Sequence, residues 1–379
     1  MTDELRPRGA PRMNGFTFDQ APLRVYWELT RACDLACRHC RAEAVRDRAA
    51  DELTTGECER VLSALAAAGP PAPHVVFTGG DPLKRPDLVD LVRAGVARGL
   101  GISVAPSATL GLSRETIHAL KDAGVSAMSL SLDGPSPAHH DGVRGVLGCF
   151  GWTLAAAAHV VGAGIPLQIN TLVSAETEPY LEETAALVAR LGASRWSLFF
   201  LIGVGRGRAL RQLTATQCEQ TLRWLARNSR WWPFTATTTE APQYRRVMLQ
   251  AVHGAGSSGA EMLASPMARG FGIRDGNGIM FIAANGDVTP SGFLPLVAGN
   301  VRARDPLAVY RESPLFRALR APRLFSGRCG DCTYRAICGG SRARAFAASG
   351  DVLGEDPLCA WDPAAAPAPR GARDRVPAA

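Results

Sequence analysis

The chain carries the stretch Glu28-Leu29-Thr30-Arg31-Ala32-Cys33-Asp34-Leu35-Ala36-Cys37-Arg38-His39-Cys40, directly after a largely apolar run, Leu23 to Leu29, that predicts a buried strand. The three cysteines have the spacing C-x3-C-x2-C, which lets one short loop place three thiolates around a single iron–sulfur cluster. Because a four-iron cluster has four irons to ligate, three cysteines would leave one iron open to a substrate or cofactor. An open metal position is typical of a site that does chemistry.

Downstream of this loop, helical and strand patterns alternate. Apolar stripes at helical spacing, two of them with Thr54 and Ser113 as capping residues, lie between short apolar runs. Those runs predict buried strands at residues 74–78, 102–105, 128–132, 167–173 and 196–202. Repeated units of this kind predict a parallel sheet covered by helices. Together with the strand before the cysteines there are six, so we expect an α/β fold, a partial (β/α)6 TIM-type barrel instead of eight closed units.

Glycine and polar residues follow the predicted strands at their carboxyl ends, where the active sites of such folds gather. Gly79-Gly80-Asp81-Pro82 comes one unit after the cysteine loop, and its glycines would let the backbone approach a ligand closely. The other candidates are two serines, an asparagine and a possible carboxylate fork: Ser107, Ser131, Asn170 and Arg144. Taken singly, each is more often a turn, a cap or a solvated side chain.

Composition is ordinary for a globular protein of 379 residues, with 46% hydrophobic and 20% charged residues. The net charge of +7 fits an acidic substrate or an acidic electron-donor protein, although a solvated basic surface explains it as well. We expect no nucleic-acid role. No apolar run reaches the ~18 residues that span a bilayer, and residues 1–14 lack an apolar signal core. We therefore expect a cytoplasmic protein that does not enter a membrane.

Seven of the ten cysteines fall into two groups, which in a cytoplasmic protein indicates metal instead of disulfides. The second group is Cys329-x2-Cys332-x5-Cys338-x20-Cys359. Four cysteines that include C-x2-C indicate a metal without choosing it, and zinc in a structural site is the simplest alternative. The remaining three, Cys58, Cys149 and Cys218, lie in or beside helical patterns and are expected to be small buried side chains.

These motifs together resemble those of the radical S-adenosylmethionine (SAM) enzymes. The resemblance implies that Cys33, Cys37 and Cys40 ligate a [4Fe–4S] cluster whose open iron chelates SAM. It also implies that SAM is cleaved reductively to a 5′-deoxyadenosyl radical, which abstracts hydrogen from the substrate.

The same resemblance implies a set of SAM contacts. His39 takes the aromatic position that packs near the adenine, while Gly79, Gly80 and Asp81 match the Gly-Gly-Glu-Pro motif for the SAM amino group, with Asp in place of the commoner Glu. Further residues match positions that often contact SAM, namely Ser107 (in place of an Asn), Ser131, Arg144 and Asn170.

The C-terminal part resembles the SPASM or twitch-like extension of radical SAM enzymes. This implies a second, auxiliary [4Fe–4S] cluster, without an open iron, on Cys329, Cys332, Cys338 and Cys359. Ser291 and Arg342 stand where that extension commonly has cysteines, so we expect one auxiliary cluster instead of two. The expected units are a flexible N-terminus (1–21), the barrel (22–232), a bridging segment (233–265), the SPASM-like domain (266–361) and a disordered tail (362–379).

Within the family, Cys338-Gly339-Gly340-Ser341-Arg342 is most similar to the subgroup of haem and haem d1 biosynthesis enzymes, with pyrroloquinoline quinone and mycofactocin maturases next. The resemblance implies hydrogen abstraction from a haem precursor that carries propionates, with flavodoxin or ferredoxin as electron donor. An alternative is maturation of a ribosomally made peptide together with a separate recognition protein. A rival from another class is a non-catalytic metal-stabilised scaffold or electron carrier.

Overall fold

The computed structural model describes residues 18–42, 44–253 and 272–365, and its strands form one sheet in the order β10-β9-β8-β1-β2-β3-β4-β5-β6-β7. Seven consecutive strands are parallel: β1 (Arg24–Glu28), β2 (His74–Thr78), β3 (Ile102–Val104), β4 (Ala127–Ser131), β5 (Leu167–Val173), β6 (Arg195–Phe200) and β7 (Thr235–Thr239). On the other side of β1 lie the parallel strand β8 (Ile279–Ile282) and then the antiparallel strands β9 (Asp287–Thr289) and β10 (Gly299–Asn300).

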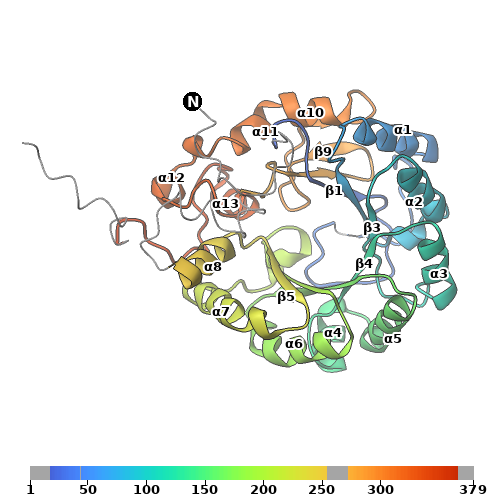
Figure 1. Cartoon of the computed structure of the whole chain (residues 1–379), viewed down its shortest axis with the longest axis horizontal. Coiled ribbons are helices and arrows are strands. Elements are labelled where there is room, and N and C mark those ends of the chain that lie inside the picture. The colour runs from blue at the N-terminus through green and yellow to red at the C-terminus, as the bar shows by residue number, and fades with distance from the viewer. Residues whose placement is uncertain (1–17, 43, 254–271, 366–379) are drawn as a thin grey trace, which may run out of the picture.

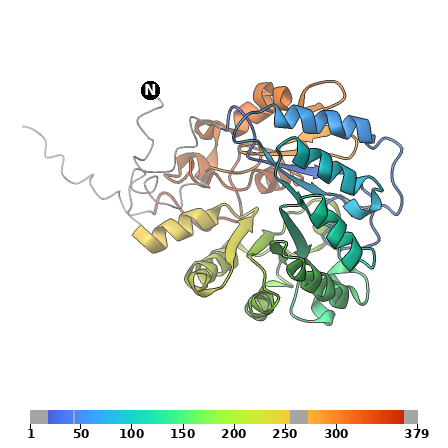
Figure 2. The same ribbon diagram turned by 45° about the vertical axis from the view of Figure 1, so that its right-hand side comes forward.

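Helices surround the curled sheet (Figure 1). Those that follow the parallel strands are α1 (Thr55–Ala66), α2 (Leu88–Ala97), α3 (Arg114–Asp122), α4 (Pro137–Arg144), α5 (Cys149–Gly162), α6 (Leu181–Arg190), α7 (Ala215–Asn228) and α8 (Gln243–His253). Figure 2 shows α1 to α5, coloured blue to green, following one another around the outside of the strands. The predicted caps are present, since Thr54 accepts from the Glu57 N–H in a capping box and Ser113 accepts from the Thr116 N–H.

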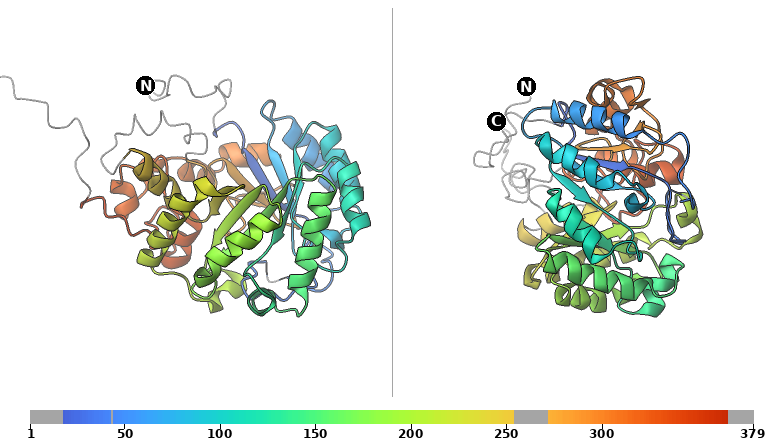
Figure 3. Two further views of the ribbon diagram at one scale, coloured as in Figure 1. Left: turned by 60° about the horizontal axis from the view of Figure 1, so that its bottom comes forward. Right: turned by 90° about the vertical axis from the view of Figure 1, so that its right-hand side faces the viewer.

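The C-terminal part adds short helices, α10 (Pro306–Glu312), α11 (Pro314–Leu319), α12 (Gly327–Asp331) and α13 (Arg342–Ser349). Coloured orange to red, they lie between α8 and α1, where among the described strands no pairing joins β7 to β10 and the sheet stays open (Figure 1). Figure 3 shows the same arrangement from two further directions, with the strands inside the helices.

The expected α/β fold with a parallel sheet is confirmed, and all six predicted strands are present as β1 to β6. The sheet also contains β7, which lies in the bridging segment (233–265), where no strand was predicted. Its sequence, Thr-Ala-Thr-Thr-Thr, has the β-branched residues that favour strands but no apolar run to reveal one. The division into domains stays a prediction. Residues 1–17, 254–265 and 366–379 of the predicted N-terminus, bridge and tail lie outside the described residues.

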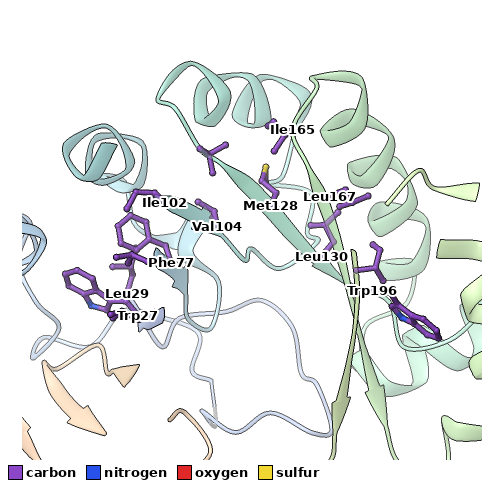
Figure 4. Close-up of a cluster of buried hydrophobic side chains, with 14 of the residues drawn as sticks. Trp27, Leu29, Phe77, Ile102, Val104, Met128, Leu130, Ile165, Leu167 and Trp196 are labelled. Carbon is purple, nitrogen blue, oxygen red and sulfur yellow. The ribbon is translucent and has the colours of Figure 1, made fainter. Parts of the chain in front are cut away.

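The main core lies between the strands and the surrounding helices. Alternate strand residues point outward into it, among them Trp27 and Phe77, whose rings meet edge to face at 5.8 Å (Figure 4). The opposite strand faces carry polar and small side chains such as Ser103, Ser129 and Gln168, which line a cavity. In a closed eight-stranded barrel this interior is packed with branched apolar side chains. Here it is left free for ligands.

Over the ranges the structure covers, no single helix is long and apolar enough to cross a membrane, although the bent pair α4 and α5 passes that test together.

Substitution of Leu130 tests this packing. The side chain is fully buried in β4, so Leu130→Ala leaves a cavity and should lower the free energy of unfolding by about 2–5 kcal/mol. Urea denaturation followed by circular dichroism measures the change. Leu147→Ala is the control because that side chain is 88% exposed, and it should have almost no effect. Equal destabilisation by both substitutions would contradict the assigned core.

Candidate active site

The cysteine loop leaves β1 at Glu28 and crosses the carboxyl end of the parallel strands. The buried Glu52 holds its start, because one carboxylate oxygen accepts from the Thr30 hydroxyl at 2.7 Å and from the Arg31 N–H at 3.1 Å. Arg48 pairs with the other oxygen at 2.8 Å. These bonds fix the loop before any ligand is present, as a preorganised binding site requires.

The three loop cysteines lie together in one partly buried cluster of side chains that also contains Cys149. The Cys33 sulfur accepts from the Leu35 N–H at 3.3 Å and lies 3.4 Å from the Ser107 hydroxyl, while the Arg144 guanidinium donates to the Cys37 sulfur at 3.7 Å. Burial raises the pKa of the Cys33 thiol, and the Ser107 and Leu35 contacts only partly offset this. A bound metal would remove that proton, and the donors already face the sulfurs.

Glycine is needed at positions 79 and 80 because the loop that carries these residues lies directly against the cysteine loop. The Gly80 N–H donates to the Thr30 carbonyl at 2.8 Å and the Asp81 N–H to the Ala32 carbonyl at 2.7 Å. A Cβ on Gly79 would lie 2.5 Å from the Thr30 oxygen, and one on Gly80 would lie 2.4 Å from the Ala32 oxygen. Because the obstructing atoms belong to the backbone, no side-chain rotation could relieve either clash. Both glycines also line the cavity.

Asp81 uses its carboxylate inside the protein. One oxygen accepts from the N–H groups of Leu83 and Ser107 at 3.1 and 3.2 Å, and the other accepts from the Thr109 hydroxyl at 3.4 Å. Burial raises the pKa of Asp81 to about 6 despite these bonds. The Ser107 hydroxyl also lies within donating distance, 3.1 Å, of the Gly80 carbonyl. Asp81 and Ser107 therefore join the loops after β2 and β3 to the cysteine loop.

Arg144 differs from the free carboxylate fork that its sequence suggests. It is largely buried and forms an ion pair of 2.6 Å with Asp133, two residues beyond the predicted Ser131. The other Asp133 oxygen accepts from the Leu172 N–H at 2.8 Å, and the Asp133 N–H donates to His140. A charge pair that close cannot be inferred from the Gly-rich context of the arginine, since residues 133 and 144 meet only in the folded chain.

Several buried donors around the cysteine loop have no hydrogen-bond partner within the described part of the chain. They are Nδ1 of His39, Nε of Arg144, and Nε and Nη2 of Arg206. Burial and the positive charge of Arg144 lower the pKa of His39 to about 4, so its ring is neutral at pH 7. Buried polar groups are normally satisfied, so these donors fit a polar ligand held beside the loop.

Arg206 was not predicted. Its backbone N–H donates to the Cys40 carbonyl at 3.0 Å, which brings it to the cysteine loop. The available signal was its position in a Gly-containing segment just after the sixth strand, the place where the other candidates were found.

A cavity of about 1450 Å³ runs along the inner faces of the strands. It exceeds the usual ~300–1,000 Å³ of small-molecule pockets, so it has room for two ligands or one large one. Ser131 and Asn170 line it, and the side-chain oxygen Oδ1 of Asn170 accepts from the Gln168 side-chain amide at 2.7 Å. Positive charge predominates among its lining residues, with Arg24, Arg41, Arg144, Arg195, Arg230, Arg245 and Arg274 against Asp133, Glu240 and Asp275.

The C-terminal cysteines also lie near one another, because Cys332 and Cys338 pack in one side-chain cluster and Cys329 and Cys359 both influence the Cys338 thiol electrostatically. Several backbone N–H groups face their sulfurs: Tyr334 donates to Cys332 and Gly340 to Cys338, each at 3.4 Å, and Asp356 donates to Cys329 at 3.5 Å. Burial raises the pKa of Cys338 to about 12 and that of Cys359 to about 11. Both thiols stay protonated at pH 7 unless a metal binds them.

Ser291 and Arg342, which were predicted to stand where the SPASM extension commonly has cysteines, lie in different surroundings. Arg342 is fully buried and donates to the Cys329 sulfur at 3.6 Å and to the Gly354 carbonyl at 2.6 Å. Ser291 instead lines the cavity. The predicted lone cysteines, Cys58, Cys149 and Cys218, are buried as expected, although Cys149 packs beside the cysteine loop.

A family model described as the Radical SAM superfamily matches residues 27–188. The chain is 37% identical to an AdoMet-dependent heme synthase of Oleidesulfovibrio alaskensis, over 91% of this chain and 88% of that protein. A PqqA peptide cyclase of Rhodopseudomonas palustris is 30% identical, over 90% of this chain and 88% of the other.

Among solved structures, Streptococcus suis SuiB bound to S-adenosylmethionine superposes with a TM-score of 0.70, covering 90% of this chain and 78% of that one. At 19% sequence identity this likeness shows the fold alone. The relatives of at least 30% identity cover nine-tenths of the chain, and their family is the one that the cysteine loop indicates. The protein therefore belongs to the radical SAM superfamily and is a radical SAM enzyme.

Proposed function

We propose that the enzyme abstracts hydrogen from a haem precursor, a tetrapyrrole that carries propionate groups. The observation that carries this proposal is the cavity, because it is large and its lining contains more arginines than carboxylates. Arginine binds carboxylates in a bidentate manner. Apolar side chains such as Tyr26, Phe199 and Phe281 also line the cavity and suit a flat aromatic body. The relative named a heme synthase is more similar than the peptide cyclase, which supports the same choice.

The residues of the cysteine loop fit a [4Fe–4S] cluster. Cys33, Cys37 and Cys40 would bind three of its irons, and hydrogen-bond donors already face two of these sulfurs. When bound, the cluster supplies the electron that cleaves SAM to methionine and a 5′-deoxyadenosyl radical. The chain would orient SAM with the unpartnered donors of His39 and Arg206 and with the backbone of the Gly79-Gly80 loop. Closing the site around it would keep water from the reactive centre.

We assign the C-terminal cysteines to an auxiliary [4Fe–4S] cluster. Backbone N–H groups of Tyr334, Gly340 and Asp356 donate to three of the four sulfurs, which suits thiolates that carry the negative charge of a cluster. With four thiolates no iron is left open, which suits electron transfer or substrate positioning.

We also propose a cytoplasmic setting, with flavodoxin or ferredoxin as the electron donor. All ten cysteines are free, as is typical of a reducing compartment. The net charge of +7 would attract an acidic donor protein.

The test of the function is direct. The protein is loaded anaerobically with iron and sulfide, reduced, and incubated with SAM and an iron porphyrin tetrapropionate. Mass spectrometry should show 5′-deoxyadenosine and a changed porphyrin. If 5′-deoxyadenosine forms while the porphyrin stays intact, the proposed substrate is wrong. Conversion of a peptide substrate instead would favour a maturase.

Cysteine substitutions should separate the two metal sites. Cys33→Ala removes a ligand of the open-iron cluster, so 5′-deoxyadenosine formation should vanish, and Cys37→Ala and Cys40→Ala should behave alike. Cys332→Ala removes a ligand only from the set of four C-terminal cysteines, so this variant should retain part of the SAM cleavage without substrate turnover. Cys58→Ala is the control, because this buried thiol contacts neither site, and it should cleave SAM normally. Complete loss in both Cys33→Ala and Cys332→Ala would contradict this division of roles.

Gly80→Ala should disrupt cluster binding without removing any ligand. Its methyl group would meet the Ala32 carbonyl and push the cysteine loop away, so most of the iron held by that loop should be lost. Iron analysis and electron paramagnetic resonance of the reduced protein measure this. The matched control is Gly142→Ala in α4, where a Cβ would meet nothing within 4 Å, and which should keep its iron. Full iron content in Gly80→Ala would show that the two loops can separate without cost.

A further inference from the structure

Three parallel strands begin with a basic residue whose side chain lines the cavity: Arg24 in β1, His74 in β2 and Arg195 in β6. Because parallel strands start at the same edge of a sheet, these side chains share the amino end of the cavity. Arg24 and His74 stand opposite one another in the register of β1 and β2. The cysteine loop lies at the other end. β1 has five residues, so at about 3.3 Å per residue the two ends lie roughly 13 Å apart.

The charges at this amino end are not neutralised within the described ranges. Neither Arg24 nor Arg195 forms an ion pair with any residue of the described ranges. Burial and the charge of Arg24 lower the pKa of Arg195, and burial and both arginines lower that of His74. The two arginines therefore repel one another, and a bound anion would offset that repulsion.

Neighbouring groups extend the site. The His74 Nε2 lies 2.8 Å from the Ser103 hydroxyl, which in turn lies 3.2 Å from the Ser126 hydroxyl. Arg245 of α8 also lines the cavity, and burial together with the charge of Arg24 lowers its pKa to about 10. The amino end thus presents guanidinium, imidazole and hydroxyl groups to one space, a set that suits a carboxylate.

We propose that Arg24 and Arg195, together with His74, bind a carboxylate of the substrate that is remote from the reacting carbon. The substrate would then be held at both ends of the cavity, one carboxylate arm near the cysteine loop and another at the strand starts. A radical takes whichever hydrogen lies nearest, so a distant anchor would select the carbon that reacts. The identity of the anion rests on the proposed function, whereas the existence of an anion-binding site does not.

The test compares wild type with Arg24→Gln/Arg195→Gln. The control is Arg93→Gln/Arg223→Gln, which removes the same charge from side chains that are 61% and 53% exposed. Absorbance titration measures the binding of a porphyrin tetrapropionate and of its uncharged tetramethyl ester. The Arg24/Arg195 variant should bind the tetrapropionate at least about ten-fold more weakly than the other two proteins. All three should bind the ester alike.

A purely structural role is tested by thermal unfolding. Loss of two mutually repelling charges should leave the melting temperature of Arg24→Gln/Arg195→Gln unchanged or raise it, whereas structural arginines would lower it.

Unchanged tetrapropionate affinity in this variant overturns the anion site while the proposed substrate stands. If wild type binds no porphyrin, the proposed substrate fails, and calorimetric titration with citrate decides on the site. Citrate binding that falls about ten-fold in the variant supports the site, and absence of citrate binding to wild type overturns it.

Discussion

The active site depends on the contact between two stretches of backbone, the cysteine loop after β1 and the Gly79-Gly80 loop after β2. Two hydrogen bonds join them, and the glycines leave no space between them. Backbone atoms cannot change rotamer, so this contact holds the loop with little conformational freedom. Glu52 on one side and Asp81 on the other extend the same constraint to the neighbouring loops. A cluster bound there would inherit its position from the sheet, which explains how a loop can hold a reactive centre accurately.

The active site also depends on the sheet being open. A closed barrel would pack its interior, whereas this one leaves polar and small residues facing a cavity, with the C-terminal helices beside the gap (Figure 1). The two cysteine sets then differ in surroundings as well as in number. The first lies beside unpartnered donors and a large cavity, and the second is enclosed by backbone N–H groups and the buried Arg342. This difference agrees with chemistry at one site and support at the other.

The six apolar strands and the cysteine and glycine motifs were predictable, because burial and metal ligation both require fixed spacings in the sequence. Features that depend on residues meeting across the fold were not. The pairing of Arg144 with Asp133, the approach of Arg206 to Cys40 and the basic residues at the strand starts all belong to this kind. β7 escaped prediction for another reason, since its threonines line the cavity and carry no apolar pattern.

The parallel pairing of β8 with β1 has a consequence for biogenesis. The cysteine loop follows β1 directly, yet the second neighbour of β1 is made only after some 250 further residues have been added. Until then β1 is an edge strand with unpaired backbone groups, able to pair with another chain. Contacts so distant in sequence also form slowly. The cysteine loop therefore reaches its final surroundings only after the C-terminal part has been synthesised, and a truncated nascent chain would expose the loop at an unprotected sheet edge.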